Sequence, residues 1–187
     1  MLQPMLAPER PRFLSRREYD RLVEDGMFVG EPIELLRGRL VTVMPQGPRH
    51  GRLVAWLGRE LTLALGRDYI VRQQMPFAAT DDSEPEPDLA VTREERGQQS
   101  HPSVAMLVVE VADSSVNRDH EDKRPIYAEA GVPEYWIVHA KTATVEVMTQ
   151  PAGDRYLSVT RLTRGDVLRP TRLPGVEIAV ADLPWAG

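Results

Sequence analysis

Apolar and polar positions along the chain follow two spacings, one typical of helices and one typical of strands. Three segments have helical spacing: residues 15–26, 50–65 and 118–130. In the second of these, apolar residues recur every three or four positions, and Gly66 stands where a helix end favours a left-handed residue. Ser15 and Glu18 have the spacing of a capping box, which indicates that the first helix begins there. The sequence therefore predicts two short helices and one long one.

Runs rich in apolar and β-branched residues lie between and after these helices. The predicted strands are residues 33–36 and 40–44, which form a hairpin near Gly38, and then 69–79, 87–91, 104–111 and 134–139. Weaker alternation predicts a peripheral hairpin over 142–149 and 156–163, and a closing strand within 173–184. The order of elements predicts an α/β (mixed α+β) fold with a mixed central β-sheet flanked by helices. An N-terminal helix and hairpin and a C-terminal β extension complete it.

Composition narrows the class of protein. A chain of 187 residues with 42% hydrophobic residues is expected to form one domain, residues 1–187, around one core at about 33–140. The absence of cysteine excludes disulfides, thiolate metal sites and cysteine nucleophiles, and it favours a cytoplasmic protein. No apolar run approaches the roughly 20 residues of a membrane span. The net charge of −5 argues against a protein that coats nucleic acid by charge alone.

One acidic residue interrupts the apolar run "LVVEVADSS", residues 107–115. Glu110 near the end of this strand needs a compensating partner, because burial of an ionised carboxylate is costly. Asp88 opens the preceding strand, so the two carboxylates can converge on a divalent cation with oxygen ligands at about 2.0–2.1 Å. The direction of the second strand stays open. The alternatives are that Glu110 reaches solvent at the strand end and that Asp88 is only a turn residue.

Lys123 supplies a cation near this pair. It lies on the stripe of its helix that is expected to pack inward, where a lysine needs an anionic neighbour such as Asp88 or Glu110. Arg118 and Arg124 are alternatives for the same role. A lysine beside a metal-bound water can stabilise the charge that builds on a phosphoryl oxygen. Two acids and a lysine thus suggest phosphodiester hydrolysis.

Three stretches, "EPDLAV", "LVVEVADSS" and "DKRPIYAEAGVPEYWIV", resemble the small bacterial Uma-type restriction endonuclease family, within the PD-(D/E)XK nuclease superfamily. The resemblance runs from about residue 34 to residue 138. It implies a restriction-endonuclease-like core, dependence on Mg²⁺ with Mn²⁺ as a substitute, and hydrolysis of DNA. It assigns the catalytic roles to Asp88, Glu110 and Lys123.

The chain departs from the superfamily pattern at the lysine. That pattern has lysine two residues after the second acid, where this chain has Ala112, and the Uma-type position matches Lys123. Pro125 is a second departure, because proline breaks a helix interior but suits a helix start. The helix is therefore expected to begin near Arg124, with Lys123 at its mouth.

The predicted metal ligands are Asp88, Glu110, the Val111 carbonyl and Glu34. Glu34 corresponds to an accessory acid of the family, although strand alternation allows it to face solvent as readily as the site. His50, beside Arg49 and Arg52, could dock a backbone phosphate or be a structural histidine.

The sequence suggests two candidate functions, which belong to different classes of protein. The first is a metal-dependent DNA endonuclease, which we expect to form a homodimer if it cuts both strands. The alternative is a nuclease fold without turnover that serves as a nucleic-acid-binding or assembly module.

Overall fold

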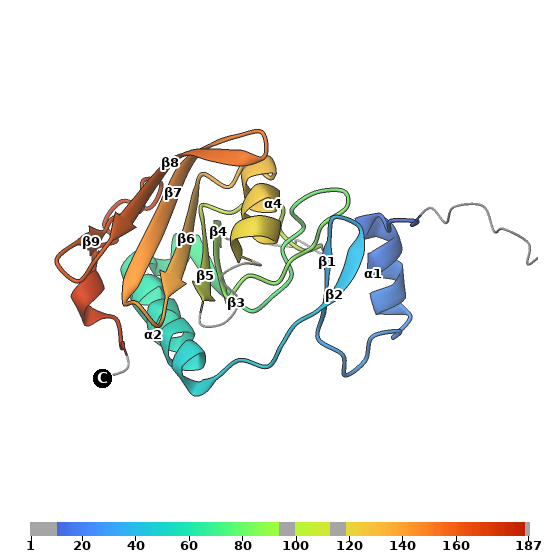
Figure 1. The fold of residues 1–187 in the computed structure, drawn as a ribbon, viewed down its shortest axis with the longest axis horizontal. Helices are drawn as coiled ribbons and strands as arrows, with labels where there is room; N and C mark the ends of the chain where they lie inside the picture. Colours follow the sequence, from blue (N-terminus) through green and yellow to red (C-terminus); the bar gives the residue numbers. More distant parts are fainter. Residues whose placement is uncertain (1–10, 94–99, 113–118, 186–187) are drawn as a thin grey trace, which may run out of the picture.

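A six-stranded sheet forms the centre of the computed structural model, which describes residues 11–93, 100–112 and 119–185 (Figure 1). Its strands, in spatial order, are β3 (Tyr69–Gln73), β4 (Leu89–Arg93), β5 (Leu107–Ala112), β6 (Glu134–His139), β7 (Thr144–Ala152) and β8 (Arg155–Leu162). Neighbouring strands are antiparallel except β5 and β6, which are parallel. The mixed sheet that the sequence predicts is confirmed, and the hairpin predicted as peripheral extends this sheet.

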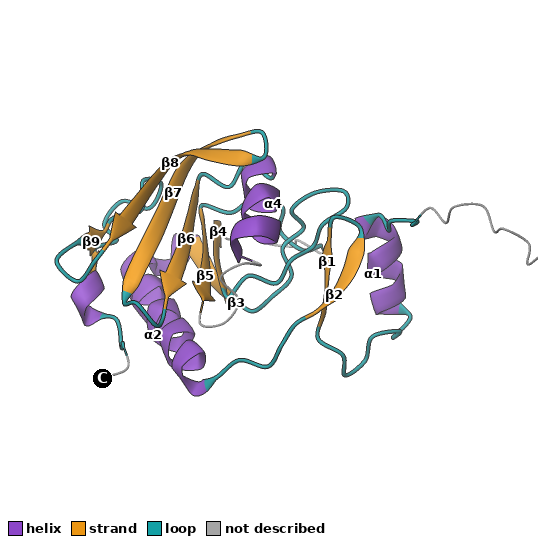
Figure 2. Ribbon diagram, in the orientation of Figure 1, coloured by secondary structure: helices purple, strands orange, loops and turns teal. Residues whose placement is uncertain are grey.

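Helices cover both faces of the sheet (Figure 2). The long helix α2 (Pro48–Leu65) packs on one face, against residues such as Leu89, Val109 and Trp136. The short helix α4 (Arg124–Glu129) packs on the other, against residues such as Val108 and Tyr135. Because side chains alternate along a strand, each strand supplies one set of residues to each layer.

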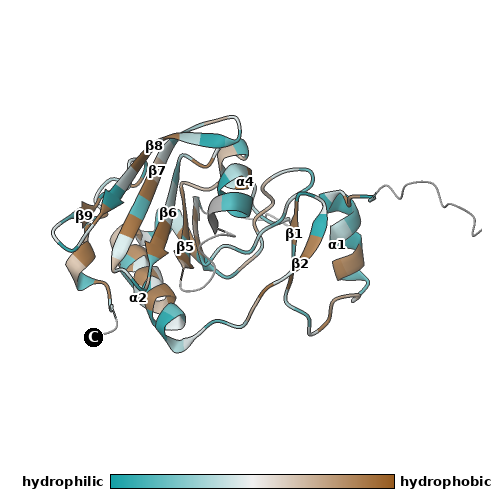
Figure 3. Cartoon of the chain, viewed as in Figure 1, coloured by the Kyte–Doolittle hydropathy of each residue, from teal (hydrophilic) through white to brown (hydrophobic). Residues whose placement is uncertain are grey.

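The central strands β5 and β6 are buried along their whole length. Figure 3 colours part of each strand as hydrophobic, and the teal and pale part of β6 reflects its polar and aromatic residues. Parallel strands that are covered on both faces are rich in apolar residues, because neither face meets water. A charged residue on either strand therefore has to find its partners within the protein.

The N-terminal part consists of α1 (Arg16–Glu24) and a hairpin of β1 (Ile33–Leu36) and β2 (Arg39–Thr42). Ser15 and Glu18 form the predicted capping box. The hairpin turns through Arg37 and Gly38, both with positive φ, as a two-residue turn of the primed type requires. Only glycine fits the second position, because a Cβ there would lie 2.5 Å from the Cβ of Phe13. Strand β2 begins one residue before, and ends two residues before, the strand predicted at 40–44.

The predicted helix over 118–130 is wrong at its start. Residues Asp119–Lys123 form a π-helical turn, and α4 begins at Arg124 with Pro125 in its first turn. Proline lacks the amide donor that a helix interior needs, and it is tolerated at a helix start. The expectation that the helix begins near Arg124 is confirmed. Arg118 and the rest of residues 113–118 lie outside the described residues.

The C-terminal part is less regular than the predicted closing strand. Short strands β9 (Val167–Leu168) and β10 (Ile178–Ala179) pair with each other, and a 3₁₀ turn (Val180–Asp182) follows. A similar 3₁₀ turn, Gly66–Asp68, follows α2 earlier in the chain. The apolar residues of the C-terminal part, including Leu168 and Trp185, join the core on the α2 face. Among the described residues, no helix has the length and apolar character to cross a membrane.

Candidate active site

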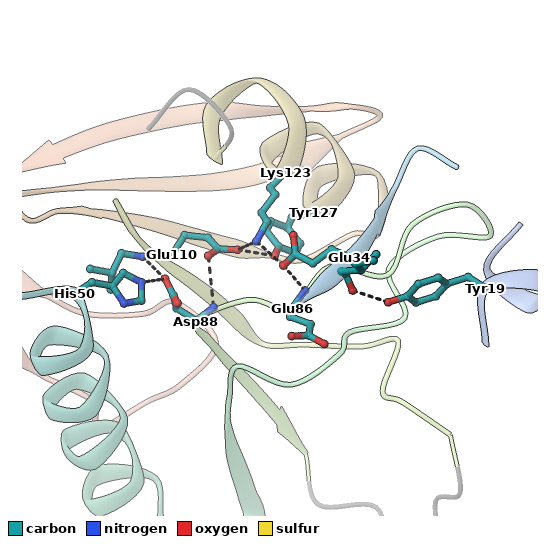
Figure 4. A network of polar contacts seen from close by, with 10 residues as sticks. Tyr19, Glu34, His50, Glu86, Asp88, Glu110, Lys123 and Tyr127 are labelled. Atoms are coloured by element: carbon teal, nitrogen blue, oxygen red, sulfur yellow. Dashed lines mark hydrogen bonds and ion pairs between the residues drawn. The ribbon is translucent and has the colours of Figure 1, made fainter. Parts of the chain in front are cut away.

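Asp88 lies directly before β4 and is almost completely buried, with 6% of its surface exposed. The β4–β5 pairing stops at Leu89 and Val109, so β5 continues past the start of β4. The Val111 amide donates to Asp88 Oδ2 over 2.8 Å. The Nε2 of His50, at the start of α2, lies 2.8 Å from the same oxygen (Figure 4). The Asp88 carboxylate thus accepts the Val111 amide beyond the end of the β4–β5 pairing, where a backbone carbonyl would otherwise be the acceptor.

Glu110 lies within β5 and does not close it, because the strand continues to Ala112. It shares the α4 face of the sheet with Val108 and Ala112. Its Oε1 accepts a hydrogen bond from the Tyr127 hydroxyl at 2.8 Å, and its Oε2 lies 3.4 Å from the Asp88 amide. The two strands run antiparallel, which settles the direction that the sequence left open, and the two acids are adjacent.

Lys123 is the last residue of the π-helical turn, and only 5% of it is exposed. Its Nζ lies 3.0 Å from Glu110 Oε1 and 3.0 Å from Glu34 Oε1 (Figure 4). Arg118, one alternative cation, lies outside the described residues. Arg124 makes no ion pair with the site in the described part of the chain. Of the residues that the structure describes, Lys123 is the lysine or arginine that contacts Glu34 and Glu110.

Glu34 lies on β1 and is 1% exposed, so it faces the site and not solvent. Its Oε1 also accepts the amide of Glu86 over 2.9 Å. Its Oε2 is buried and has no hydrogen-bond partner in the described part of the chain. The hydroxyl of Tyr19 on α1 donates to the carbonyl of Ile33 over 2.7 Å and fixes the strand next to Glu34 (Figure 4). The N-terminal hairpin thus contributes one acid to the site.

Tyr127 is a residue of the site that was not predicted from the sequence. Its ring is fully buried, and burial, reinforced by the charge of Glu110, raises the pKa of its hydroxyl well above the usual value. The hydroxyl therefore remains a neutral donor to Glu110 at working pH. The signal was its position one helical turn after Lys123, which places the two side chains on the same face.

The contact between His50 and Asp88 was also missed. The buried residues of α2 are His50, Leu53, Val54, Leu57, Gly58 and Leu61. His50 therefore occupies the first position of the core-facing stripe, three residues before Leu53, and this spacing is visible in the sequence. The imidazole is fully buried, so it is not an exposed phosphate contact.

The model of the Uma2 family, described as "Putative restriction endonuclease", matches residues 17–181. The chain belongs to this family. The resemblance inferred from the motifs is thereby confirmed, and membership in the Uma2 family supports a nuclease-like function.

A solved structure has the same fold. It is described as a putative nuclease belonging to DUF820 from Anabaena variabilis; the superposition has a TM-score of 0.71 and covers 91% of this chain and 97% of that chain. The two sequences are 16% identical, so the likeness concerns the fold. No curated protein matches the chain.

The charged side chains of this Uma2 site lie close together in a buried place. In the described part of the chain, the ammonium of Lys123 pairs with Glu34 and Glu110, and the Asp88 amide lies 3.4 Å from Glu110 Oε2. Nearby, burial raises the pKa of Glu86, and the charge of Glu34 adds to the shift. Acids that lie together in a buried place are stabilised by nearby cations or by bound protons.

The arrangement of donors bears on which cation fits. Within the described ranges, no three His, Asp or Glu side chains stand together in the arrangement of a metal site; the ammonium of Lys123 lies between Glu34 and Glu110. The donors themselves are carboxylate oxygens, which Mg²⁺ and Mn²⁺ prefer. Among the described residues, the buried Glu34 Oε2 accepts no hydrogen bond, and the side-chain hydrogen bonds of Asp88 use Oδ2 and not Oδ1. The chemistry of these donors therefore suits a hard divalent cation, whereas their arrangement in the described residues is not that of a metal site.

Proposed function

We propose that this Uma2 protein is a metal-dependent DNA endonuclease that hydrolyses phosphodiester bonds. One observation carries the proposal: Asp88, Glu110, Lys123 and Glu34, from four separate segments, converge in one buried cluster. Family membership supports nuclease chemistry for this cluster. The carboxylate oxygens of this cluster, which are the donors that hard divalent cations prefer, support a divalent cation as its cofactor.

Mg²⁺, or Mn²⁺ in its place, would be held by Asp88, Glu110, the Val111 carbonyl and Glu34. When bound, such an ion supplies a Lewis acid and a hydroxide source at neutral pH. Lys123 would orient the attacking water and donate to the phosphoryl oxygen on which charge develops. For this role its ammonium would have to share its two carboxylate partners with the ion. Tyr127 would keep Glu110 in place during that exchange, because its hydroxyl is a neutral donor.

Plasmid cleavage tests this proposal. The purified protein with Mg²⁺ or Mn²⁺ should nick or linearise supercoiled plasmid, and a chelator should stop the reaction. Asp88→Asn and Glu110→Gln should each abolish cleavage while the fold persists, because each preserves shape and removes a ligand charge. Lys123→Ala should slow cleavage on the order of 10²-fold or more, as loss of one transition-state donor does.

Two controls separate the assignments. Glu177→Gln removes an exposed carboxylate that pairs with Arg169 and should leave cleavage unchanged. If Lys123→Ala cuts normally and Arg124→Ala does not, Lys123 is the wrong cation. A wild-type protein that binds DNA but cuts neither single- nor double-stranded DNA with either metal would instead be a nucleic-acid-binding module.

A further inference from the structure

His50 is a polar side chain in an otherwise apolar stripe. The residues that follow it on the inner face of α2, Leu53, Val54 and Leu57, are apolar and buried. The imidazole has no exposed surface, and its Nδ1 has no hydrogen-bond partner in the described part of the chain. An apolar residue would fill this position without burying an unsatisfied nitrogen. Packing alone therefore does not account for a histidine here.

The one described contact that requires the imidazole is with Asp88. A carboxylate oxygen only accepts, so Nε2 donates to Asp88 Oδ2 over 2.8 Å. The Val111 amide donates to the same oxygen, also over 2.8 Å. Two donors from different elements, α2 and β5, thus hold one oxygen and fix the rotation of the carboxylate. This leaves Oδ1 as the oxygen that the side chain can present.

The support behind the imidazole is rigid. His50 lies in the first turn of an 18-residue helix that begins at Pro48 and is anchored on the sheet by its apolar stripe. A donor on such an element holds its acceptor more precisely than a donor on a loop.

We propose that His50 is a positioning residue that orients the Asp88 carboxylate toward the divalent cation. The inference rests on the proposed nuclease function, in which Asp88 is a metal ligand. His50 acts through Asp88 by donating one hydrogen bond.

The hydrogen bond itself can be measured in the metal-free protein. With ¹⁵N-labelled histidine, the Nε2 proton of His50 should give a signal that exchanges slowly with water, because it is buried and donates to a carboxylate. The signal should disappear in His50→Gln, which assigns it, and should shift in Asp88→Asn. Its absence from the folded wild-type protein would overturn the inference, whatever the protein cleaves.

Mn²⁺ titration by calorimetry tests the positioning role. His50→Gln keeps an N–H donor at a similar reach and should bind Mn²⁺ nearly as tightly as the wild type. His50→Leu has similar bulk but no donor, and its affinity should be about 10–100-fold weaker, as for other partners of metal ligands. Leu57→Ala is the matched control: it destabilises the same helix from the same core and should leave Mn²⁺ affinity unchanged.

The outcomes separate the two proposals. Equal Mn²⁺ affinity in the wild type and in folded His50→Leu would overturn the positioning role and leave the nuclease proposal standing. The same would follow if His50→Gln lost affinity as strongly as His50→Leu, because the donor would then not be what matters. A folded wild type that binds no Mn²⁺ and cuts no DNA would overturn the nuclease proposal and this role with it.

Discussion

At the residue scale, each carboxylate of the site is held by hydrogen bonds from identified donors. Asp88 Oδ2 accepts from His50 and Val111, and Glu110 Oε1 accepts from Tyr127 and Lys123. Buried acids survive in a core when their hydrogen bonds are satisfied in this way. The donors also define which oxygens face the reaction, so removing one should change both stability and chemistry.

Tyr127→Phe tests this for Glu110. The substitution keeps the ring and removes only the hydroxyl, so a buried carboxylate oxygen loses one donor. We expect a loss of about 1–3 kcal/mol of unfolding free energy, measured by urea denaturation, and slower plasmid cleavage. Tyr156→Phe is the control, because its buried hydroxyl donates over 3.0 Å to the Val132 carbonyl, away from the site carboxylates. It should lose stability without losing cleavage; equal effects on cleavage would contradict a specific role for Tyr127.

Glu84 is a buried acid outside the site. It is 4% exposed, its Oε1 lies 4.0 Å from His101 Nε2, and Asp20 and Arg16 lie beside it. Burial, followed by the charge of Asp20, raises its pKa from 4.5 to about 7. Because the folded pKa is the higher one, its contribution to stability is fully present below about pH 4.5 and is lost as the pH rises through about 7.

Glu84→Gln should remove this pH dependence, because the amide stays neutral. The difference in melting temperature, variant minus wild type, should be distinctly more positive at pH 8 than at pH 5. Glu24 is an exposed acid that lines one surface pocket together with Glu84, and Glu24→Gln should show a difference that does not change with pH. A constant difference for Glu84→Gln across this range would show that Glu84 is ionised throughout.

At the element scale, regular segments could be predicted from spacing, and their ends depended on contacts that spacing does not contain. The period of α2 and the capping box at Ser15 are local signals, and both are confirmed. The π-helical turn before α4 is not local in this sense, because it coincides with Lys123 reaching Glu34, 89 residues earlier in the chain. The antiparallel return of β5 likewise depended on packing between distant segments.

The residues of the site could likewise be predicted from the sequence only in part. Asp88 and Glu110 could be paired from the sequence because they lie on consecutive strands. Glu34 could not be placed, since alternation on a strand gives two faces and does not say which one is buried. His50 and Tyr127 have the spacing of inner stripes, but a stripe alone does not name the partner across the core. Their roles as ligands and donors remain predictions.

Pro125→Ala tests how the turn before α4 places Lys123. Alanine restores an amide, so α4 can extend backwards through Asp119–Lys123 and replace the wider π turn by α-helical geometry. Lys123 would then rotate away from Glu34 and Glu110, and cleavage should slow by up to about 10²-fold, as small misplacements of catalytic groups do. Circular dichroism should show slightly more helix. Pro133→Ala, between α4 and β6, is the control and should keep the cleavage rate.

At the scale of the whole molecule, metal binding should couple to folding. A ligand that binds only the folded state stabilises it, by about 2.7 kcal/mol at a concentration one hundred times its Kd. Mn²⁺ and Mg²⁺ should therefore raise the melting temperature of the wild type in calorimetry. The double variant Asp88→Ala, Glu110→Ala should show no such rise. Equal Mn²⁺ affinity in the wild type and the double variant would contradict a metal site at these residues.

The separation in sequence between Glu34 and Lys123 also matters while the protein is being made. Glu34 leaves the ribosome early, but its partner lies 89 residues later, and α4 packs against β7 and β8, which follow later still. Contacts between distant segments form late, because the intervening chain must be ordered first. The growing chain therefore carries its acids without an assembled site, and a nuclease built in this way would be inert toward nucleic acid until synthesis is nearly complete.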